Sequence, residues 1–206
     1  MTTRTSISSL TSPPHPDAQL HQLFPIMLTL VVTKQIGTSP FDDHWQIRLR
    51  AAQIVKRLRD RYSDRYGRLH ARLLQTYLQA ITDTSKSLPT QYGGIVGITA
   101  MGHRAVYHLL VPAMRALKER YADNTKDARM CQQALFDAAL MLTEKLKEMM
   151  LEQRDAGVCD ELRDKKRELV NDEFNAEETF RQLHEIFGDL IVPTTIVASD
   201  VKDVVL

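Results

Sequence analysis

The chain has 206 residues, of which 43% are hydrophobic and 6% aromatic, with only 8 glycines and 8 prolines. This length can bury a substantial core in one domain or form an array of repeats. The net charge is +1, and long amphipathic segments replace alternating β-branched runs, so we predict an all-α fold.

The charges are unevenly distributed along the chain. Residues 41–122 contain fourteen Lys or Arg against six Asp or Glu, a net +8, whereas residues 123–190 contain ten against seventeen, a net −7. We expect the two ends of a helical array to differ in electrostatic potential. Two solvated faces are the simpler interpretation.

The sequence gives no sign of export or of a membrane span. Cys131 and Cys159 do not form a disulfide or zinc pattern, so a reducing compartment is expected. The N-terminus lacks the apolar core of a signal peptide. The longest apolar run, residues 23–32, contains Pro25 and is far shorter than the roughly 20 residues that span a bilayer. We therefore expect a soluble protein inside the cell.

The N-terminal half predicts a linker and three helices. Residues 1–16 are rich in Ser, Thr and Pro and are expected to be a disordered lead-in or linker. Residues 17–36 predict a helix with Asp17 as N-cap, bent or divided by Pro25. The next helix is capped by Asp42 or Asp43 and ends near residue 62, with an apolar stripe of Ile47, Ala51, Ile54, Leu58 and Tyr62. A third helix follows the turn at Gly67 and ends near residue 82, with a stripe of Leu69, Leu73, Tyr77 and Ile81.

Residues 88–112 contain four of the eight glycines. A helix is predicted from Pro89, in a first-turn position, to about residue 101. Each glycine inside it costs about 1 kcal/mol relative to alanine, which indicates close packing or an unusual backbone. Gly93, Gly97 and Ala100 share one face, and Tyr92, Ile95, Val96 and Thr99 share another. Gly102 and His103 form a hinge, and the helix that follows should bend at Pro112.

The C-terminal half predicts a long helix and a charged helical region. Thr125 opens the long helix, which ends near residue 150, with a stripe of Ala134, Leu135, Ala138, Leu142, Leu146 and Met149. Residues 160–188 are highly charged, and their expected core residues are Leu162, Leu169, Phe174, Phe180, Leu183 and Phe187. Residues 191–206 form a tail that is extended or frayed. Residues 17–190 thus predict one α-solenoid of four to five antiparallel helix pairs, with the roughly 40-residue period of HEAT or armadillo repeats.

No grouping of residues indicates an enzyme, a cofactor or a metal. The glycine run is neither G-x-G-x-x-G nor a Walker A loop, so close helix packing explains it better than nucleotide binding. The seven histidines include no H-E-x-x-H, and His44 and His103 are better explained as capping or packing groups. Acidic pairs near residue 175 lie in a charged helix, and no Ser/His/Asp or Cys/His set has loop context.

One basic segment is the candidate surface for a partner or for DNA. It consists of Arg48, Arg50, Lys56, Arg57, Arg59, Arg61, Arg65, Arg68 and Arg72. The simplest interpretation is a solvated face. Docking to an acidic protein surface and salt-dependent contact with nucleic-acid phosphates are the two functional alternatives.

Two motifs in this sequence resemble a known family. The first is a His-Trp-x-x-Arg helix, formed by His44, Trp45 and Arg48, with Ala51 and Ala52 nearby. The second comprises Tyr92, Gly93, Gly97, Gly102, His103, Leu109 and Pro112. Over about residues 20–117 they resemble the C-terminal region of TFIID subunit six, a TATA-binding-protein-associated factor. Asp43 and the segment 47–52 also resemble the second helix of a HEAT repeat, although an ordinary amphipathic helix would look similar.

The resemblance implies a nuclear, non-catalytic HEAT-repeat scaffold. Its partners would be other TFIID subunits and, in some assemblies, subunits of the SAGA coactivator. The family pairs with TBP-associated factor nine through an N-terminal histone fold that these 206 residues do not contain. No cofactor or membrane is implied, and a helical-repeat module that contacts nucleic acid is the alternative.

Overall fold

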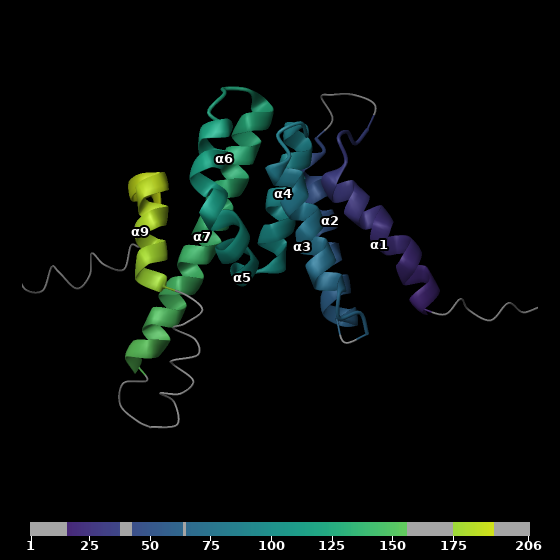
Figure 1. Cartoon of the computed structure of the whole chain (residues 1–206), viewed down its shortest axis with the longest axis horizontal. Coiled ribbons are helices and arrows are strands. Elements are labelled where there is room, and N and C mark those ends of the chain that lie inside the picture. The colour runs from purple at the N-terminus through teal and green to yellow at the C-terminus, as the bar shows by residue number, and fades with distance from the viewer. Residues whose placement is uncertain (1–15, 38–42, 64, 156–174, 192–206) are drawn as a thin grey trace, which may run out of the picture.

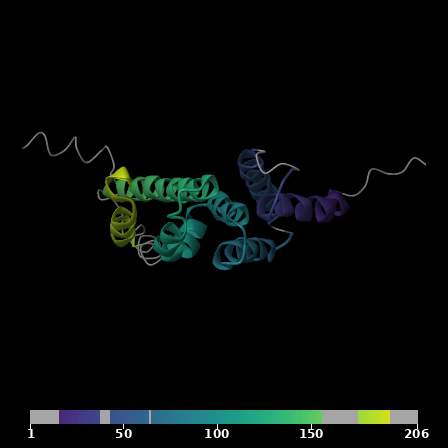
Figure 2. The ribbon, with the colours of Figure 1, turned by 90° about the horizontal axis from the view of Figure 1, so that it is seen from above.

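The computed structural model of the chain describes residues 16–37, 43–63, 65–155 and 175–191. All regular structure in these ranges is helical, which confirms the all-α prediction. The α-helices are α1 (Pro16–Val32), α2 (Trp45–Tyr62), α3 (Leu69–Thr82), α4 (Leu88–Met101), α5 (His103–Ala105), α6 (Met114–Arg120), α7 (Lys126–Asp155) and α9 (Ala176–Phe187). They form an elongated row with α1 at one end, α4 near the middle and α9 at the other end (Figure 1; Figure 2).

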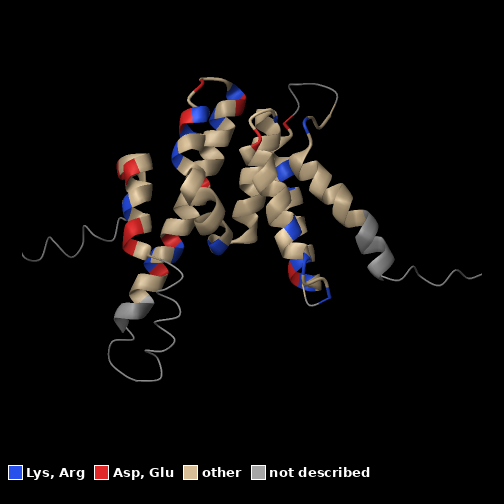
Figure 3. Cartoon of the chain, viewed as in Figure 1, with Lys and Arg blue, Asp and Glu red and all other residues tan. Residues whose placement is uncertain are grey.

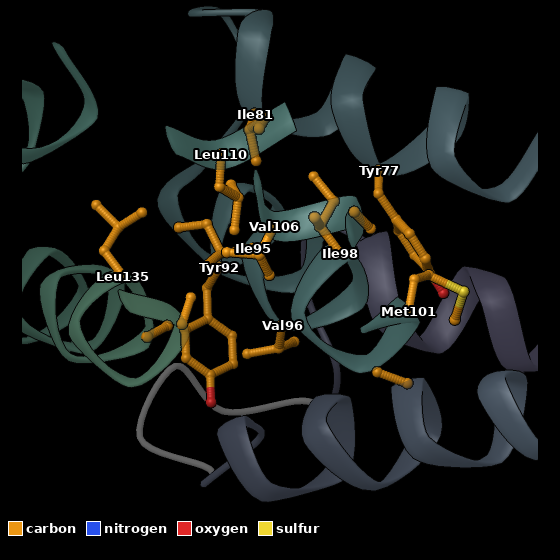
Figure 4. Packing of buried hydrophobic residues seen from close by; sticks show 14 of the residues in the cluster. Tyr77, Ile81, Tyr92, Ile95, Val96, Ile98, Met101, Val106, Leu110 and Leu135 are labelled. Carbon is orange, nitrogen blue, oxygen red and sulfur yellow. The ribbon is translucent and has the colours of Figure 1, made fainter. Parts of the chain in front are cut away.

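Helix α4 is the centre of the array. It packs against α1, α2 and α3 on one side of the row and against α7 on the other. Every residue from Thr90 to Ile98 is buried, so α4 has no solvated face in its middle. Figure 4 shows its apolar side chains surrounded by those of Tyr77, Ile81, Leu110 and Leu135. An all-round apolar helix of this kind is typical of a core element.

Helix α1 is one continuous helix, whereas a division at Pro25 was one expectation. It begins at Pro16, so Asp17 lies within the helix and is not its N-cap, and it ends at Val32, before the expected residue 36. The hydroxyl of Thr29 donates to the Pro25 carbonyl at 2.8 Å. The missing N–H of a proline removes one helical hydrogen bond, and here the helix tolerates that loss.

Helix α2 ends at Tyr62 as predicted, but its start and its buried face differ from the prediction. The residue before the helix is His44, not an aspartate. Ile47 and Ile54 of the predicted stripe are 44% and 39% exposed, so these two positions are wrong, whereas Ala51 is buried and Leu58 and Tyr62 are half-buried. The buried residues are instead Trp45, Arg48, Ala51, Ala52 and Val55. The apolar pattern missed this face because it contains a buried arginine.

Helices α3 and α4 have the predicted bounds within one residue. Leu73, Tyr77 and Ile81 of the predicted stripe in α3 are buried, and Leu69 at the start of the helix is half-buried. Pro89 lies in the first turn of α4. The predicted loop between the helices contains Asp83, whose carboxylate accepts hydrogen bonds from the backbone and the hydroxyl of Ser85.

The segment after α4 bends where the sequence predicted. Short helix α5 continues into a π-helical turn, Val106–Leu110, and a 3₁₀ turn, Val111–Ala113, before α6 begins. Pro112 lies in the 3₁₀ turn. Because proline has no N–H, the carbonyl four residues earlier loses its α-helical partner, and the backbone changes its hydrogen-bond spacing there.

Helix α7 is the longest described element, with 30 residues. Thr125 precedes it, and the Thr125 hydroxyl accepts the backbone N–H of Ala128 at 3.2 Å, so the predicted opening is confirmed. The helix continues about one turn beyond the expected end. Its predicted core residues are buried: Ala134, Leu135, Ala138, Leu142 and Leu146. Met149, the last residue of the predicted stripe, is half-buried.

The C-terminal helix α9 packs against α7, with Leu183 buried and Phe180 and Phe187 half-buried. It is capped by Asn175, whose side-chain oxygen accepts the backbone N–H of Glu178 at 3.1 Å. The predictions for residues 1–15, for residues 156–174 with Leu162, Leu169 and Phe174, and for the tail 192–206 lie outside the described residues. Of the helices in the described part, none is long and apolar enough to cross a membrane.

Lys and Arg gather on α2 and at the start of α3, near one end of the array, whereas α9 at the other end carries both signs (Figure 3). The ion pairs Arg181–Glu178 and Arg115–Glu185 involve α9. Six of the seventeen acidic residues of the acidic half belong to residues 156–174, which lie outside the described ranges. The structure therefore shows the cluster of basic residues on α2 and α3, whereas a net acidic potential at the other end of the array stays a prediction.

Candidate functional site

Arg48 is buried and holds the end of α1. Its exposed fraction is 0%, and its Nη1 donates to the carbonyl oxygens of Val31 at 2.9 Å and Thr33 at 2.8 Å. Carbonyls at a helix C-terminus lack intrahelical donors and carry partial negative charge, so a guanidinium there satisfies both needs. The expectation that Arg48 belongs to an exposed basic surface is therefore wrong.

His44 accepts a hydrogen bond from the same arginine. Arg48 Nε donates to His44 Nδ1 at 3.3 Å, which requires that nitrogen to be unprotonated. Burial lowers the pKa of His44, and the charge of Arg48 lowers it further, so the imidazole is neutral. Burial also lowers the pKa of Arg48 to about 10, and the guanidinium keeps its charge at neutral pH.

The second motif meets the first at the same place. The rings of Trp45 and Tyr92 lie edge to face, with centroids 4.8 Å apart at 76°. At Gly93 a Cβ atom would lie 1.9 Å from the Val31 carbonyl oxygen, so only glycine lets α4 approach α1 this closely. His44, Trp45, Arg48, Tyr92 and Gly93 thus surround the end of α1, and we call them the Arg48 cluster.

The other glycines of α4 serve a different neighbour. A Cβ atom on Gly97 would lie 2.6 Å from the ring of Tyr77, and one on Gly94 would lie 2.7 Å from Ile81 Cγ2 and 2.8 Å from the Tyr77 carbonyl. These contacts are with α3. The glycines therefore let α4 pack tightly between two helices, α1 and α3, whereas the sequence suggested one close neighbour.

The remaining motif residues lie at a helix contact, a helix end and a turn. Ala51 is 2% exposed on the buried face of α2. Gly102 ends α4 with φ of +107°, a conformation that favours glycine, and His103 begins α5. Pro112 is exposed in the 3₁₀ turn before α6.

Sequence reasoning missed a second polar cluster, at the opposite side of α4. Arg120 Nη1 donates to the Ile81 carbonyl at 2.8 Å, near the end of α3. The Tyr121 hydroxyl donates to Gln91 Oε1 at 2.8 Å, and Gln91 Nε2 donates to the Lys86 carbonyl at 2.8 Å. Like Arg48, Arg120 places a guanidinium at a helix C-terminus. The one available signal was Gln91, a polar residue inside an apolar, glycine-rich run.

The other eight members of the basic segment separate into two groups. Arg59 faces inward: it pairs with Asp60, and its Nη1 lies 3.3 Å from His70 Nδ1 of α3. The remaining seven are exposed: Arg50, Lys56, Arg57, Arg61, Arg65, Arg68 and Arg72. Arg50, Arg57 and Arg61 recur at helical spacing on the outer face of α2, whereas Arg68 and Arg72 line a groove between α1 and α3. The structure therefore does not bring the basic residues together on one face.

Residues 7–115 match the family model of the TAF6 C-terminal HEAT repeat domain. The chain is 37% identical over 97 residues to Transcription initiation factor TFIID subunit 6 of Arabidopsis thaliana, covering 47% of this chain and 18% of that protein. It is 32% identical over 134 residues to SAGA complex/transcription factor TFIID complex subunit Taf6 of Schizosaccharomyces pombe, covering 61% and 30%. Against TFIID subunit 6 of Drosophila melanogaster the identity is 26% over 102 residues, covering 49% and 17%. The chain thus spans less than a third of the length of these relatives, and no solved structure matches it significantly.

The family match includes α1 to α5 and therefore contains the whole Arg48 cluster. Both sequence motifs meet in that cluster, around the end of α1. The match also covers more than half of the chain. The chain therefore belongs to the TAF6 C-terminal HEAT repeat domain family.

Proposed function

We propose that the chain is a non-catalytic protein–protein scaffold domain of TFIID, which acts in RNA polymerase II transcription initiation in the nucleus. The observation that carries the proposal is the family match over residues 7–115, where the helices pack around α4. The relatives from Arabidopsis and Drosophila are named as TFIID subunits, and the fission yeast relative is named as a subunit of both SAGA and TFIID. As partners of this domain we propose other TBP-associated factors and SAGA subunits.

The structure supports a rigid scaffold in two ways. Helix α4 is buried on all sides, so its neighbours are fixed relative to one another. Arg48 and Arg120 then hold the C-terminal ends of α1 and α3. Helical-repeat arrays bind partners with their extended outer surfaces, which a fixed helix arrangement keeps in shape.

The polar side chains of the core are suited to structure and not to catalysis. The buried Arg48 and the exposed Arg120 both donate to backbone carbonyls. Burial raises the pKa of the Cys131 thiol to about 12, and the Sγ donates to the Leu88 carbonyl, so the thiolate needed for nucleophilic attack is not formed at neutral pH. We therefore propose that this domain is not an enzyme.

Affinity purification tests the scaffold function. A tagged chain expressed in its own host should recover TBP-associated factors, identified by mass spectrometry. The exchange Gly93→Leu should abolish this recovery, because it drives a side chain into the backbone of α1. If the folded chain, checked by circular dichroism, recovers no TFIID or SAGA subunit, the proposal fails.

Contact with nucleic acid is tested separately. Duplex DNA is titrated with the chain at low and at moderate salt. The nucleic-acid alternative requires binding at low salt that weakens steeply as salt rises, and the absence of binding at low salt excludes that alternative.

A further inference from the structure

A groove of about 680 Å³ lies between α1 and the first half of α3. Its floor is apolar, formed by Phe24 and Leu28 of α1 and by Leu69 and Leu73 of α3. Phe24 and Leu73 are buried, whereas Leu28 and Leu69 are half-buried and offer apolar surface to solvent. The groove is thus a place where two neighbouring helices leave part of the core uncovered.

A second hollow, of about 630 Å³, continues along α3 towards its C-terminal end. Its lining is mostly polar, with Lys34, Lys86 and uncharged hydroxyl and amide side chains around the apolar Val32 and Ala80. The Lys86 amino group lies 3.7 Å from the Asp83 carboxylate. Thr76 lines both hollows, so they meet halfway along the helix. Together they follow the 14 residues of α3, which is about 21 Å at 1.5 Å per residue. We call this continuous depression the α3 groove.

The rim of the α3 groove is basic. Arg68 and Arg72 are exposed, lie four residues apart at the start of α3, and line the first hollow. Within the described part of the chain, neither forms an ion pair. The first turn of α3 contains no acidic residue, so both guanidinium groups add to the positive end of the helix dipole. Positive charges at the N-terminus of a helix do not stabilise the helix, and they attract carboxylates from a binding partner.

We propose that the α3 groove docks an amphipathic helix from another protein subunit, whose apolar face covers Leu28 and Leu69 and whose Asp or Glu residues pair with Arg68 and Arg72. This inference rests on the proposed scaffold function and names the chemistry of one partner segment. An apolar helix face laid in a groove, with charges at its edge, is a common mode of peptide recognition. The length of the groove fits about 14 helical residues.

The chemistry of the groove distinguishes this occupant from others. Nucleic acid would need cations along its path. Here the first hollow has an apolar floor, and uncharged residues of α3 from Leu73 to Ala80 line the part between the cationic ends. Residues 1–15 of the chain contain one arginine and no acidic residue, so they lack the charges that complement Arg68 and Arg72. An acidic, amphipathic segment can cover the apolar floor of the first hollow and pair with the arginines of the rim.

Photo-crosslinking in the assembled complex tests the proposal. Benzoylphenylalanine is placed at Thr76, inside the groove, and at Ile54, on the exposed outer face of α2, as the control. Both tagged chains are purified with their TFIID subunits, and the crosslinked peptides are identified by mass spectrometry. Position 76 should crosslink to one segment of another subunit that combines apolar and acidic residues, and position 54 should not reach that segment.

Charge reversal then tests the rim. The pair Arg68→Glu and Arg72→Glu should reduce the crosslink from position 76 at least tenfold. The pair Lys56→Glu and Arg57→Glu makes the same change in net charge on exposed residues of α2 outside the groove, and should reduce it less than twofold. Equal losses in both pairs would show a general charge effect and overturn the proposal.

The two proposals can fail separately. If TFIID subunits are recovered but position 76 crosslinks to nothing, to DNA, to a second copy of the chain, to residues 156–174 of the same chain or to a segment without acidic residues, the groove proposal is wrong and the scaffold function stands. If a correctly folded chain recovers no subunit, both are wrong.

Discussion

The guanidinium of Arg48 in α2 donates a 2.9 Å hydrogen bond to the carbonyl of Val31, 17 residues earlier in the chain. A Cβ atom on residue 93 of α4 would lie only 1.9 Å from the oxygen of the same carbonyl, so α1, α2 and α4 meet at one backbone group. The packing of the three helices at this point thus depends on one arginine and one glycine. This relationship leads to the first predictions.

Replacing Arg48 should strongly destabilise the domain. Arg48→Met keeps much of the side-chain volume but removes the buried donor to the Val31 carbonyl and one of the two donors to the Thr33 carbonyl, and we expect a loss of about 3 kcal/mol in the free energy of unfolding. Urea unfolding monitored by circular dichroism measures this. Arg50→Met, at an exposed position of the same helix, is the matched control and should change stability by less than about 0.5 kcal/mol. Equal losses in the two variants would contradict the role assigned to Arg48.

Stability should fall as the pH drops below neutrality. Burial, followed by the charge of Arg48, lowers the pKa of His44 below its ordinary value of 6.5, so the unfolded chain binds a proton more readily than the folded one. The contribution of His44 is therefore complete above about pH 6.5 and decreases at lower pH, through the window between its unfolded and folded pKa values.

The variant His44→Gln isolates this effect, because a glutamine can accept the same Arg48 hydrogen bond but does not titrate. Urea unfolding at pH 5, 6, 7 and 8 should show a shallower loss for the variant than for the native chain. His70 also has a lowered pKa, through burial and then Arg59, so some pH dependence should remain in the variant. An identical pH dependence in both proteins would exclude His44 as a contributor.

The glycines of α4 should differ in their tolerance of alanine. At Gly93 the added methyl group would overlap backbone of α1, which cannot rotate away, and we expect a loss of 3 kcal/mol or more, about the upper end of overpacking effects. At Gly97 the methyl group would meet the ring of Tyr77, and a loss of about 1–3 kcal/mol is expected. Gly67→Ala meets no atom within 4 Å and should be nearly neutral. Thermal unfolding of the three variants gives the order of their stabilities. A Gly93→Ala variant as stable as the native chain would contradict the close approach of α1 and α4.

Gln91 and Tyr121 should show coupled effects. Gln91→Leu leaves the buried Tyr121 hydroxyl without an acceptor, which costs about 1–3 kcal/mol. Adding Tyr121→Phe removes that hydroxyl and should recover part of the loss. A double-mutant cycle by urea unfolding measures the coupling, which should exceed about 0.5 kcal/mol. Additive losses would show that the 2.8 Å contact between them contributes nothing.

Tyr77→Phe should not destabilise the domain. The Tyr77 hydroxyl is buried without a hydrogen-bond partner among the described residues, and burial raises its pKa strongly. Its removal relieves an unsatisfied polar group, so we expect stability to be unchanged or to rise by about 1 kcal/mol. The control is Tyr121→Phe, which removes a hydroxyl that is hydrogen-bonded and should destabilise. If Tyr77→Phe lost stability as Tyr121→Phe does, the Tyr77 hydroxyl would have a partner in solution.

The local pattern of the sequence determined most helix boundaries. Apolar spacing and the turn at Gly67 gave α3, Pro89 marked the start of α4, and Thr125 marked the start of α7. These predictions succeeded because caps, prolines and periodicity act within a few residues. The family, and with it the HEAT-type fold, could also be read from two short motifs.

Only the tertiary structure decided what the motif residues do. Arg48 was counted as a surface cation because an arginine without a local partner is normally solvated. Its partners are the carbonyls of Val31 and Thr33, and only the packing of α1 beside α2 brings them within reach. The same holds for Gln91 with Arg120 and Tyr121, which lie about 30 residues apart in the chain. Helix formation depends on neighbours in sequence, whereas the role of a buried arginine or of a glycine at a helix contact depends on neighbours in space.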